Sequence, residues 1–307
     1  MMSTSGLKTW WRGNFVATVT PFDAAERVDE RRFVANLELL LDEGADGFVV
    51  AGCTGEGWAI RPDERIRLFE LALSTVAGQV PVIAGLSGIV TGDVVELGQR
   101  AKQAGVQGVL VLPPYFALPG AREIVVFFQA VSDGAQLPIM IYNNPRRTGI
   151  NLQPALLAEL ATIEHVVAVK ESSADFVQTE RTIQELGDRL AVFTGHSAER
   201  GAAAVLMGAA GLVSSVETQT MGRRAMLLYD TAAHGDYAEA RAIQLETLAV
   251  QQAVHSCGCT SPADLKAAMN LLGRPGGSPR SPILPVSDEQ NAKLARNLRQ
   301  VGLLNGG

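Results

Sequence analysis

Cysteine, histidine and long apolar runs are scarce in this chain. Only three cysteines occur among 307 residues, which argues against a disulfide-stapled secreted fold. No stretch reaches the ~18 apolar residues of a membrane-spanning helix, and the first residues lack the apolar run of a secretion signal. The four histidines do not cluster with carboxylates, so nothing indicates a metal site. We therefore expect a cytoplasmic protein that needs no membrane, metal or cofactor.

Charged residues are also few, and acidic ones outnumber basic ones. The sequence has 26 Lys and Arg against 32 Asp and Glu, a formal net charge of −6. Nucleic-acid binding requires clustered cations to neutralise phosphates, so a nucleic-acid partner is not expected. Hydrophobic residues make up 47% of the chain, which excludes a disordered protein and allows a large core.

Short apolar runs alternate with longer segments whose apolar residues recur at helical spacing. The eight runs have few polar interruptions, which is typical of parallel strands covered on both faces. They lie at residues 15–20, 47–52, 80–84, 108–112, 138–142, 166–170, 190–194 and 211–215. The helical segments lie at 30–43, 63–77, 91–104, 121–133, 153–161, 175–186 and 198–207. This alternation predicts an α/β fold, a closed (β/α)8 TIM barrel.

The pattern changes after the eighth run, because no further strand-like segment follows. Helices are predicted over 219–234, 236–255, 261–272 and 287–303. We expect a barrel domain at residues 1–232 that carries the active site, and a C-terminal helical domain at residues 233–307 packed on it.

Lys170 is the most unusual residue at a predicted strand end, where the reacting groups of such barrels lie. It closes the apolar run VVAVK, so its ammonium would sit in or beside the barrel interior. Burial lowers the pKa of a lysine, and a neutral amine can attack a ketone to form a Schiff base. The structural alternative is a lysine that pairs with Glu171 or extends to solvent.

Three other residues could serve the same chemistry. Tyr142 ends the preceding run, and its phenol could transfer protons to the amine's adduct, although a packed aromatic would look the same. The Gly-rich turn around Thr54 offers amides and a hydroxyl to a carboxylate, or is an ordinary strand-to-helix turn. Arg147 could clamp a second carboxylate, or lie solvated in a surface loop.

Seven motifs occur in a fixed order: TVTPF, AGCTGE, VPVIAG, LPPYF, IYNNPRRTG, AVKESS and FTGHSAE. In this order and at these separations they resemble the dihydrodipicolinate synthase and N-acetylneuraminate lyase family of class I pyruvate-dependent lyases. The resemblance extends from about residue 13 to residue 303. It implies a (β/α)8 barrel with a C-terminal helical domain, assembled as a homotetramer from two tight dimers.

The resemblance also implies roles for individual residues. Lys170 matches the Schiff-base lysine and Tyr142 the proton-relay tyrosine. Thr54, with the amides around Cys53 and Thr54, would hold the carboxylate of pyruvate or another 2-oxo acid. Arg147 matches the arginine that, in the synthase branch, holds the carboxylate of the aldehyde substrate.

Other positions match the family's pocket or depart from it. Gly195 and Val213 match positions that line the pocket of the nucleophile. Cys53 stands where the synthases have the first of two threonines. Phe116 replaces a tyrosine that reaches the pocket across the dimer interface, and His196 replaces an acidic residue. A thiol and a phenyl ring do not relay protons as hydroxyls do, which places lysine-pathway synthase activity in doubt.

We therefore expect a Schiff-base lyase or aldolase that acts on pyruvate or a related small 2-oxo acid, with an aldehyde as a possible second substrate. The synthase reaction ranks first because of Arg147. A sugar-acid aldolase, or a dehydratase or deaminase of a hydroxylated 2-oxo acid, follows closely because of Phe116 and Cys53. Two further alternatives are a non-catalytic 2-oxo-acid-binding paralogue and a metal-dependent barrel aldolase. The sequence does not identify the second substrate or the direction of the reaction.

Overall fold

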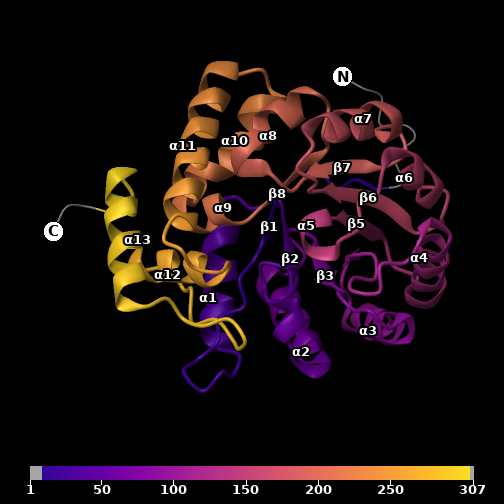
Figure 1. The fold of residues 1–307 in the computed structure, drawn as a ribbon, viewed down its shortest axis with the longest axis horizontal. Helices are drawn as coiled ribbons and strands as arrows, with labels where there is room; N and C mark the ends of the chain where they lie inside the picture. Colours follow the sequence, from indigo (N-terminus) through magenta and orange to yellow (C-terminus); the bar gives the residue numbers. More distant parts are fainter. Residues whose placement is uncertain (1–8, 305–307) are drawn as a thin grey trace.

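The computed structural model describes residues 9–304, and its centre is a closed barrel of eight parallel strands (Figure 1). Each strand pairs with the next along the chain, and β8 pairs with β1 to complete the ring. The strands are β1 (Gly13–Ala17), β2 (Gly47–Val50), β3 (Val82–Gly85), β4 (Gly108–Val111), β5 (Ile139–Asn143), β6 (Val166–Glu171), β7 (Ala191–Thr194) and β8 (Gly211–Ser214). The predicted (β/α)8 barrel is confirmed.

Helices follow the strands and surround the barrel (Figure 1). They are α1 (Glu30–Asp42), the short 3-10 helix η1 (Gly57–Ala59), α2 (Pro62–Val76), α3 (Thr91–Ala104), α4 (Ala121–Ala135), α5 (Pro145–Thr148), α6 (Pro154–Leu160), α7 (Phe176–Leu186) and α8 (Ser197–Leu206). Local sequence sets several starts: the Asp29 side chain accepts the Arg32 amide at the start of α1, and Pro62 occupies the first position of α2.

Two apolar layers hold the barrel together. Side chains that point inward, such as Phe15, Met140 and Phe193, fill the interior of the ring. A larger cluster, which includes Phe48 and Phe128, packs between the strands and the surrounding helices. Because both faces of the strands are covered, the strands read as continuous apolar runs in the sequence.

Five helices follow the last strand, and the final ones lie along one side of the barrel (Figure 1). They are α9 (Val216–Met221), α10 (Arg223–Ala233), α11 (Tyr237–His255), α12 (Ala263–Leu271) and α13 (Asp288–Gln300). One apolar cluster joins α11, α12 and α13 to Val19 of the barrel and Val216 of α9. The division of the chain into domains at residues 1–232 and 233–307 stays a prediction.

The single helix predicted over residues 219–234 is wrong, because the chain breaks at Gly222. This residue has φ +60° and ψ −134° and separates α9 from α10. A Cβ atom at Gly222 would overlap the Glu43 carboxylate. The position therefore requires glycine, and the break turns the chain from the end of the barrel toward its outer helices.

None of the helices between residues 9 and 304 is long and apolar enough to cross a bilayer. All three cysteines are free thiols, as their small, odd number predicts.

Candidate active site

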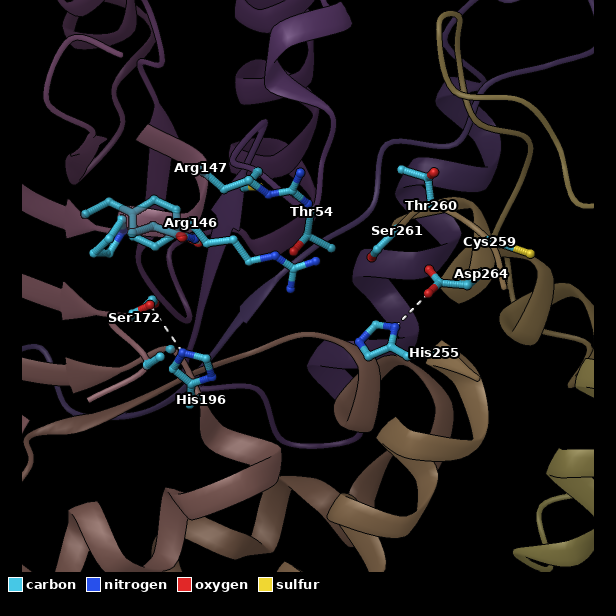
Figure 2. Close-up of a pocket in the computed structure, with 16 residues that line it drawn as sticks. Thr54, Arg146, Arg147, Ser172, His196, His255, Cys259, Thr260, Ser261 and Asp264 are labelled. Carbon is cyan, nitrogen blue, oxygen red and sulfur yellow. Dashed lines mark hydrogen bonds and ion pairs between the residues drawn. The ribbon is translucent and has the colours of Figure 1, made fainter. Parts of the chain in front are cut away.

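A cavity of about 620 Å³ opens at the carboxyl ends of the strands, where barrel loops and C-terminal helices meet (Figure 2). Its barrel side is lined by Cys53, Thr54, Tyr142, Arg147 and Gly195, all predicted from the sequence. Parallel strands bring their carboxyl ends to one edge of the barrel, which is why residues so far apart in the sequence meet here.

Lys170 lies near the end of β6, directly opposite Tyr142 of β5 in the sheet register. Its side chain is buried, with 5% of the residue exposed, and its Nζ lies 4.3 Å from the centre of the Tyr142 ring. Burial is the main cause that lowers the pKa of Lys170 to about 8, against the opposing fields of Cys53 and Glu217. The amine is thus held beside the cavity with a strongly increased neutral fraction.

Glu171 does not neutralise this lysine, so the pairing alternative considered for Lys170 is wrong. The fully buried Glu171 carboxylate accepts hydrogen bonds from Asn143 Nδ2 at 2.9 Å, from the Ser173 amide at 2.7 Å and from Gln178 Nε2 at 3.3 Å. Because neighbouring residues of a strand point to opposite faces, Glu171 faces away from the lysine. Lys170 also does not extend to solvent.

Tyr142 is buried, and its hydroxyl oxygen accepts a hydrogen bond of 2.8 Å from Asn144 Nδ2. Burial raises the pKa of the phenol, and the nearby Cys53 thiol adds to the increase. The phenol therefore keeps its proton at neutral pH and can donate it to an oxygen that forms beside Lys170.

The turn after β2 presents Cys53 and Thr54 to the cavity, and buried contacts of Glu56 hold this turn in place. The Glu56 carboxylate is fully buried and forms an ion pair with Lys266 of α12. Its second oxygen accepts the Arg280 amide at 3.0 Å. A buried charge must be paired to be tolerated, so this contact holds the turn in one position against the C-terminal helices.

Gly195 follows β7 and allows the closest approach to the lysine. A Cβ atom built on Gly195 would lie 2.9 Å from Lys170 Cε and would overlap Ser172 Oγ. Only a residue without a Cβ leaves room for both side chains. The sequence prediction named Gly195, but it missed Ser172, which lines the cavity beside it.

Three predicted residues are not among those that line the cavity within this chain. Lys170 lies buried directly behind Tyr142 and Gly195, which do line it. Val213 of β8 is buried in the barrel interior. Phe116 is 89% exposed with φ +69°, on the surface beyond β4. Its expected place in the pocket of a partner subunit stays a prediction.

His196 is fixed by contacts on both ring nitrogens. Nδ1 lies 2.6 Å from Glu199 Oε2, and Nε2 lies 3.2 Å from the Ser172 carbonyl oxygen (Figure 2). The residue lines the cavity, but the two contacts leave neither nitrogen available to a substrate.

The sequence prediction missed the wall of the cavity that the C-terminal part of the chain supplies. Four polar side chains form it: His255, Thr260, Ser261 and Asp264 (Figure 2). Arg146 faces the same cavity from α5, next to the predicted Arg147, whose guanidinium lies 5.9 Å from the centre of the Trp58 ring. No pattern in the sequence pairs α12 with the strand ends, so these residues could not be placed from it.

Known proteins resemble this chain over nearly its full length. Residues 11–301 match the dihydrodipicolinate synthetase family. An uncharacterized DapA-like lyase from Rhizobium meliloti is 37% identical over 299 residues, covering 97% of this chain and 98% of that protein. The 4-hydroxy-tetrahydrodipicolinate synthase of Pelobacter propionicus is 33% identical over 295 residues, with 96% and 100% covered.

Solved structures give the same result. Dihydrodipicolinate synthase from Aquifex aeolicus superposes with a TM-score of 0.89 at 30% identity, covering 95% of this chain and 99% of that one. A prophage protein of the dihydrodipicolinic acid synthase family from E. coli K12, solved in complex with pyruvate, has a TM-score of 0.90 at 26% identity, with 96% and 100% covered. Sequence match, fold and coverage agree, and the chain belongs to the dihydrodipicolinate synthetase family, as a class I lyase.

Proposed function

We propose that this protein is a lyase that forms a Schiff base between Lys170 and pyruvate or a related small 2-oxo acid. The observation that carries the proposal is the buried Lys170 amine, opposite Tyr142 in the register and with a pKa lowered to about 8. At neutral pH this pKa makes the neutral amine roughly 300 times more abundant than the ordinary lysine pKa of 10.5 does. The pyruvate complex of the E. coli prophage relative supports the choice of substrate.

The chemistry begins with attack of the neutral Nζ on the keto carbon of the substrate. The keto oxygen takes up a proton from the Tyr142 phenol, and the resulting carbinolamine loses water to give the protonated imine. The Tyr142 phenolate then takes a proton from the neighbouring carbon and becomes a phenol again, and the electron pair of that C–H bond moves toward the imine nitrogen to give an enamine. The enamine can then add to an aldehyde, and the reverse sequence cleaves a carbon–carbon bond.

Residues around the lysine orient the substrate. The amides and hydroxyl of the turn at Cys53 and Thr54 would receive the 2-oxo acid carboxylate, since anions bind at such clusters of backbone N–H groups. The Arg147 guanidinium would hold a carboxylate of the second substrate through paired hydrogen bonds. Both elements line the same cavity as Tyr142.

Two reactions remain for the enamine, and Arg147 ranks the synthase reaction first. The resemblance to the synthase branch implies condensation of pyruvate with an aldehyde that carries a carboxylate, and a relative from Pelobacter propionicus is named a 4-hydroxy-tetrahydrodipicolinate synthase. The second candidate is aldol cleavage, dehydration or deamination of a hydroxylated 2-oxo acid. Cys53 favours it, because a thiol replaces the hydroxyl that the synthases place beside the tyrosine.

Borohydride trapping tests the proposal. The protein is incubated with pyruvate and reduced, and mass spectrometry then locates the adduct. We expect an adduct at Lys170 in the wild type and none in Lys170→Ala. Turnover with a panel of aldehydes and hydroxylated 2-oxo acids then ranks the two reactions. Trapping without any turnover indicates a non-catalytic binding protein, and wild-type turnover by Lys170→Ala contradicts the mechanism.

A further inference from the structure

The cavity has a second wall, supplied by the C-terminal part of the chain, that the proposed chemistry leaves without a role. The last residue of α11, His255, and Asp264 of α12 form its wall (Figure 2). Arg146 extends from α5 into the same space, on the barrel side. None of these three residues has a part in the proposed Schiff-base chemistry, while α5 also carries Arg147 and α12 also carries Lys266.

Asp264 fixes the orientation of the His255 ring. The carboxylate is fully buried, and its Oδ2 lies 2.6 Å from His255 Nδ1, while Oδ1 accepts the Leu265 amide at 2.7 Å. Each carboxylate oxygen is therefore engaged in one such contact. The hydrogen bond to Asp264 raises the pKa of His255 and favours its charged form.

His255 Nε2 is left available as a hydrogen-bond donor. Within residues 9–304 this nitrogen has no hydrogen-bond partner, and the side chain is 40% exposed. His196 differs, because both of its ring nitrogens are already engaged. Of these two histidines on the cavity wall, only His255 has a nitrogen free for a ligand.

Arg146 brings an uncompensated positive charge to the same space. Its guanidinium makes no ion pair or hydrogen bond with any residue that the structure describes, and no acidic side chain of the cavity is free to pair with it. Its positive charge opposes the rise that Asp264 causes in the pKa of His255, and both side chains line the same cavity. The charge of His255 is compensated by Asp264, whereas that of Arg146 is not, so the group as a whole keeps one positive charge that an anion would compensate.

We infer that Arg146 and His255 form a subsite for a second anionic group, at the end of the substrate remote from its keto carbon. This inference rests on the proposed function, because the imine at Lys170 fixes the other end of the substrate. The substrate is then a 2-oxo acid that also carries a distal carboxylate or phosphate. The guanidinium fork binds either group through paired hydrogen bonds, and His255 Nε2 supplies another donor.

The subsite is separate from the arginine that the family resemblance assigns to the aldehyde carboxylate. Arg147 packs over Trp58 and also borders a smaller, largely apolar cavity of about 280 Å³ that contains Leu112, Tyr115 and Ile283. Arg146 and His255 line the larger cavity but not the smaller one, whereas Arg147 lines both. We therefore assign the two arginines to different parts of a bound molecule.

Pairs of 2-oxo acids that differ in the distal group test the subsite. The concentration that gives half-maximal borohydride adduct at Lys170 is measured for 2-oxoglutarate against 2-oxopentanoate, and for 2-oxoadipate against 2-oxohexanoate. We expect the diacid of at least one pair to need about tenfold less, the effect of a charge-assisted hydrogen bond. A phosphonate analogue, 2-oxo-4-phosphonobutanoate, compared with 2-oxoglutarate, shows which anion binds better.

Variants test whether Arg146 and His255 cause the preference for the diacid. In the wild type the half-maximal concentration of the monoacid, divided by that of the diacid, should be about ten. Arg146→Gln should reduce this ratio to near one, Arg146→Lys should keep part of it, and His255→Gln should lower it while still donating to Asp264. Arg31→Gln, on the exposed face of α1, is the matched control and should keep the ratio. The subsite would be overturned if diacid and monoacid had equal half-maximal concentrations in both pairs of the wild type. It would also be overturned if Arg146→Gln left the ratio of these concentrations unchanged.

A separate measurement distinguishes failure of the subsite from failure of the proposed function. Absence of any adduct with pyruvate at Lys170 contradicts the Schiff-base proposal alone. Titration calorimetry with glutarate against pentanoate, and adipate against hexanoate, then tests the subsite directly, because these acids have no keto group. Tighter binding of a diacid that is lost in Arg146→Gln supports the subsite, and equal binding of both pairs contradicts it.

Discussion

Replacement of Gly195 by alanine tests the packing behind the proposed nucleophile. The new Cβ would lie 2.9 Å from Lys170 Cε and 3.1 Å from Ser172 Cβ, and it would overlap Ser172 Oγ. An ordinary contact begins at 3.4 Å, so Lys170 Cε must move by about 0.5 Å and Ser172 must leave its position. The amine would then approach the keto carbon from a displaced position.

The expected effect is large on the chemistry and moderate on the fold. A displacement of about 1 Å can reduce a rate about 100-fold, so we expect the initial rate of adduct trapping with pyruvate to fall between about 10- and about 100-fold. Overpacking should lower the free energy of unfolding by about 1–3 kcal/mol. Trapping followed by mass spectrometry gives the first value, and denaturant unfolding gives the second.

Two further variants make this test specific. Gly92→Ala in α3 is the control, because no atom lies within 4 Å of its new Cβ, and it should increase stability by up to about 1 kcal/mol without changing trapping. Ser172→Ala in the Gly195→Ala background removes the overlap with Oγ but not the contact with Lys170, so it should restore stability more than trapping. A Gly195→Ala protein that traps pyruvate at the wild-type rate would refute the reasoning.

Three other predictions follow from the same contacts. The initial trapping rate should rise about tenfold per pH unit up to about pH 8 and then level off, because the amine must lose its proton and its pKa is lowered to about 8; a rise that continues to pH ~10 would contradict this. Lys266→Met should lower the free energy of unfolding by about 3–5 kcal/mol in denaturant, because it leaves the buried Glu56 charge without its cation. Adding Glu56→Gln should recover part of this loss, and equal stability of the single and double variants would contradict the pairing. Phe116→Asp should shift the expected homotetramer to a smaller species in light scattering, because it places a charge on a large exposed apolar side chain; an unchanged mass would exclude Phe116 from an interface.

The barrel can be predicted from the sequence because each strand is recognisable from its own residues, without knowledge of what packs against it. Runs such as VVAVK are apolar on both faces, and only a parallel sheet covered on both sides accommodates them. Prediction fails at Gly222, since glycine is tolerated inside a helical pattern and the neighbouring Glu43 carboxylate is invisible in the sequence. The break depends on a contact between residues far apart in the chain.

Some residues of the candidate site can likewise be predicted from the sequence, and others cannot. Lys170 and Tyr142 follow from their strand ends, because adjacent parallel strands carry them to the same edge. His255 and Asp264 could not be predicted, because their meeting depends on how the loop between α11 and α12 packs against the barrel. Periodicity predicts these helices but not which of their residues face the cavity.

The ion pair between Glu56 and Lys266 joins residues that are 210 positions apart, and this separation has a consequence for biosynthesis. On the ribosome, β8 emerges and can complete the ring before α12 has been translated. Until then the buried Glu56 carboxylate has no Lys266 to pair with. A nascent chain that ends before α12 therefore lacks the contact that fixes the turn at Cys53 and Thr54, so the candidate site depends on one of the last segments to be synthesised.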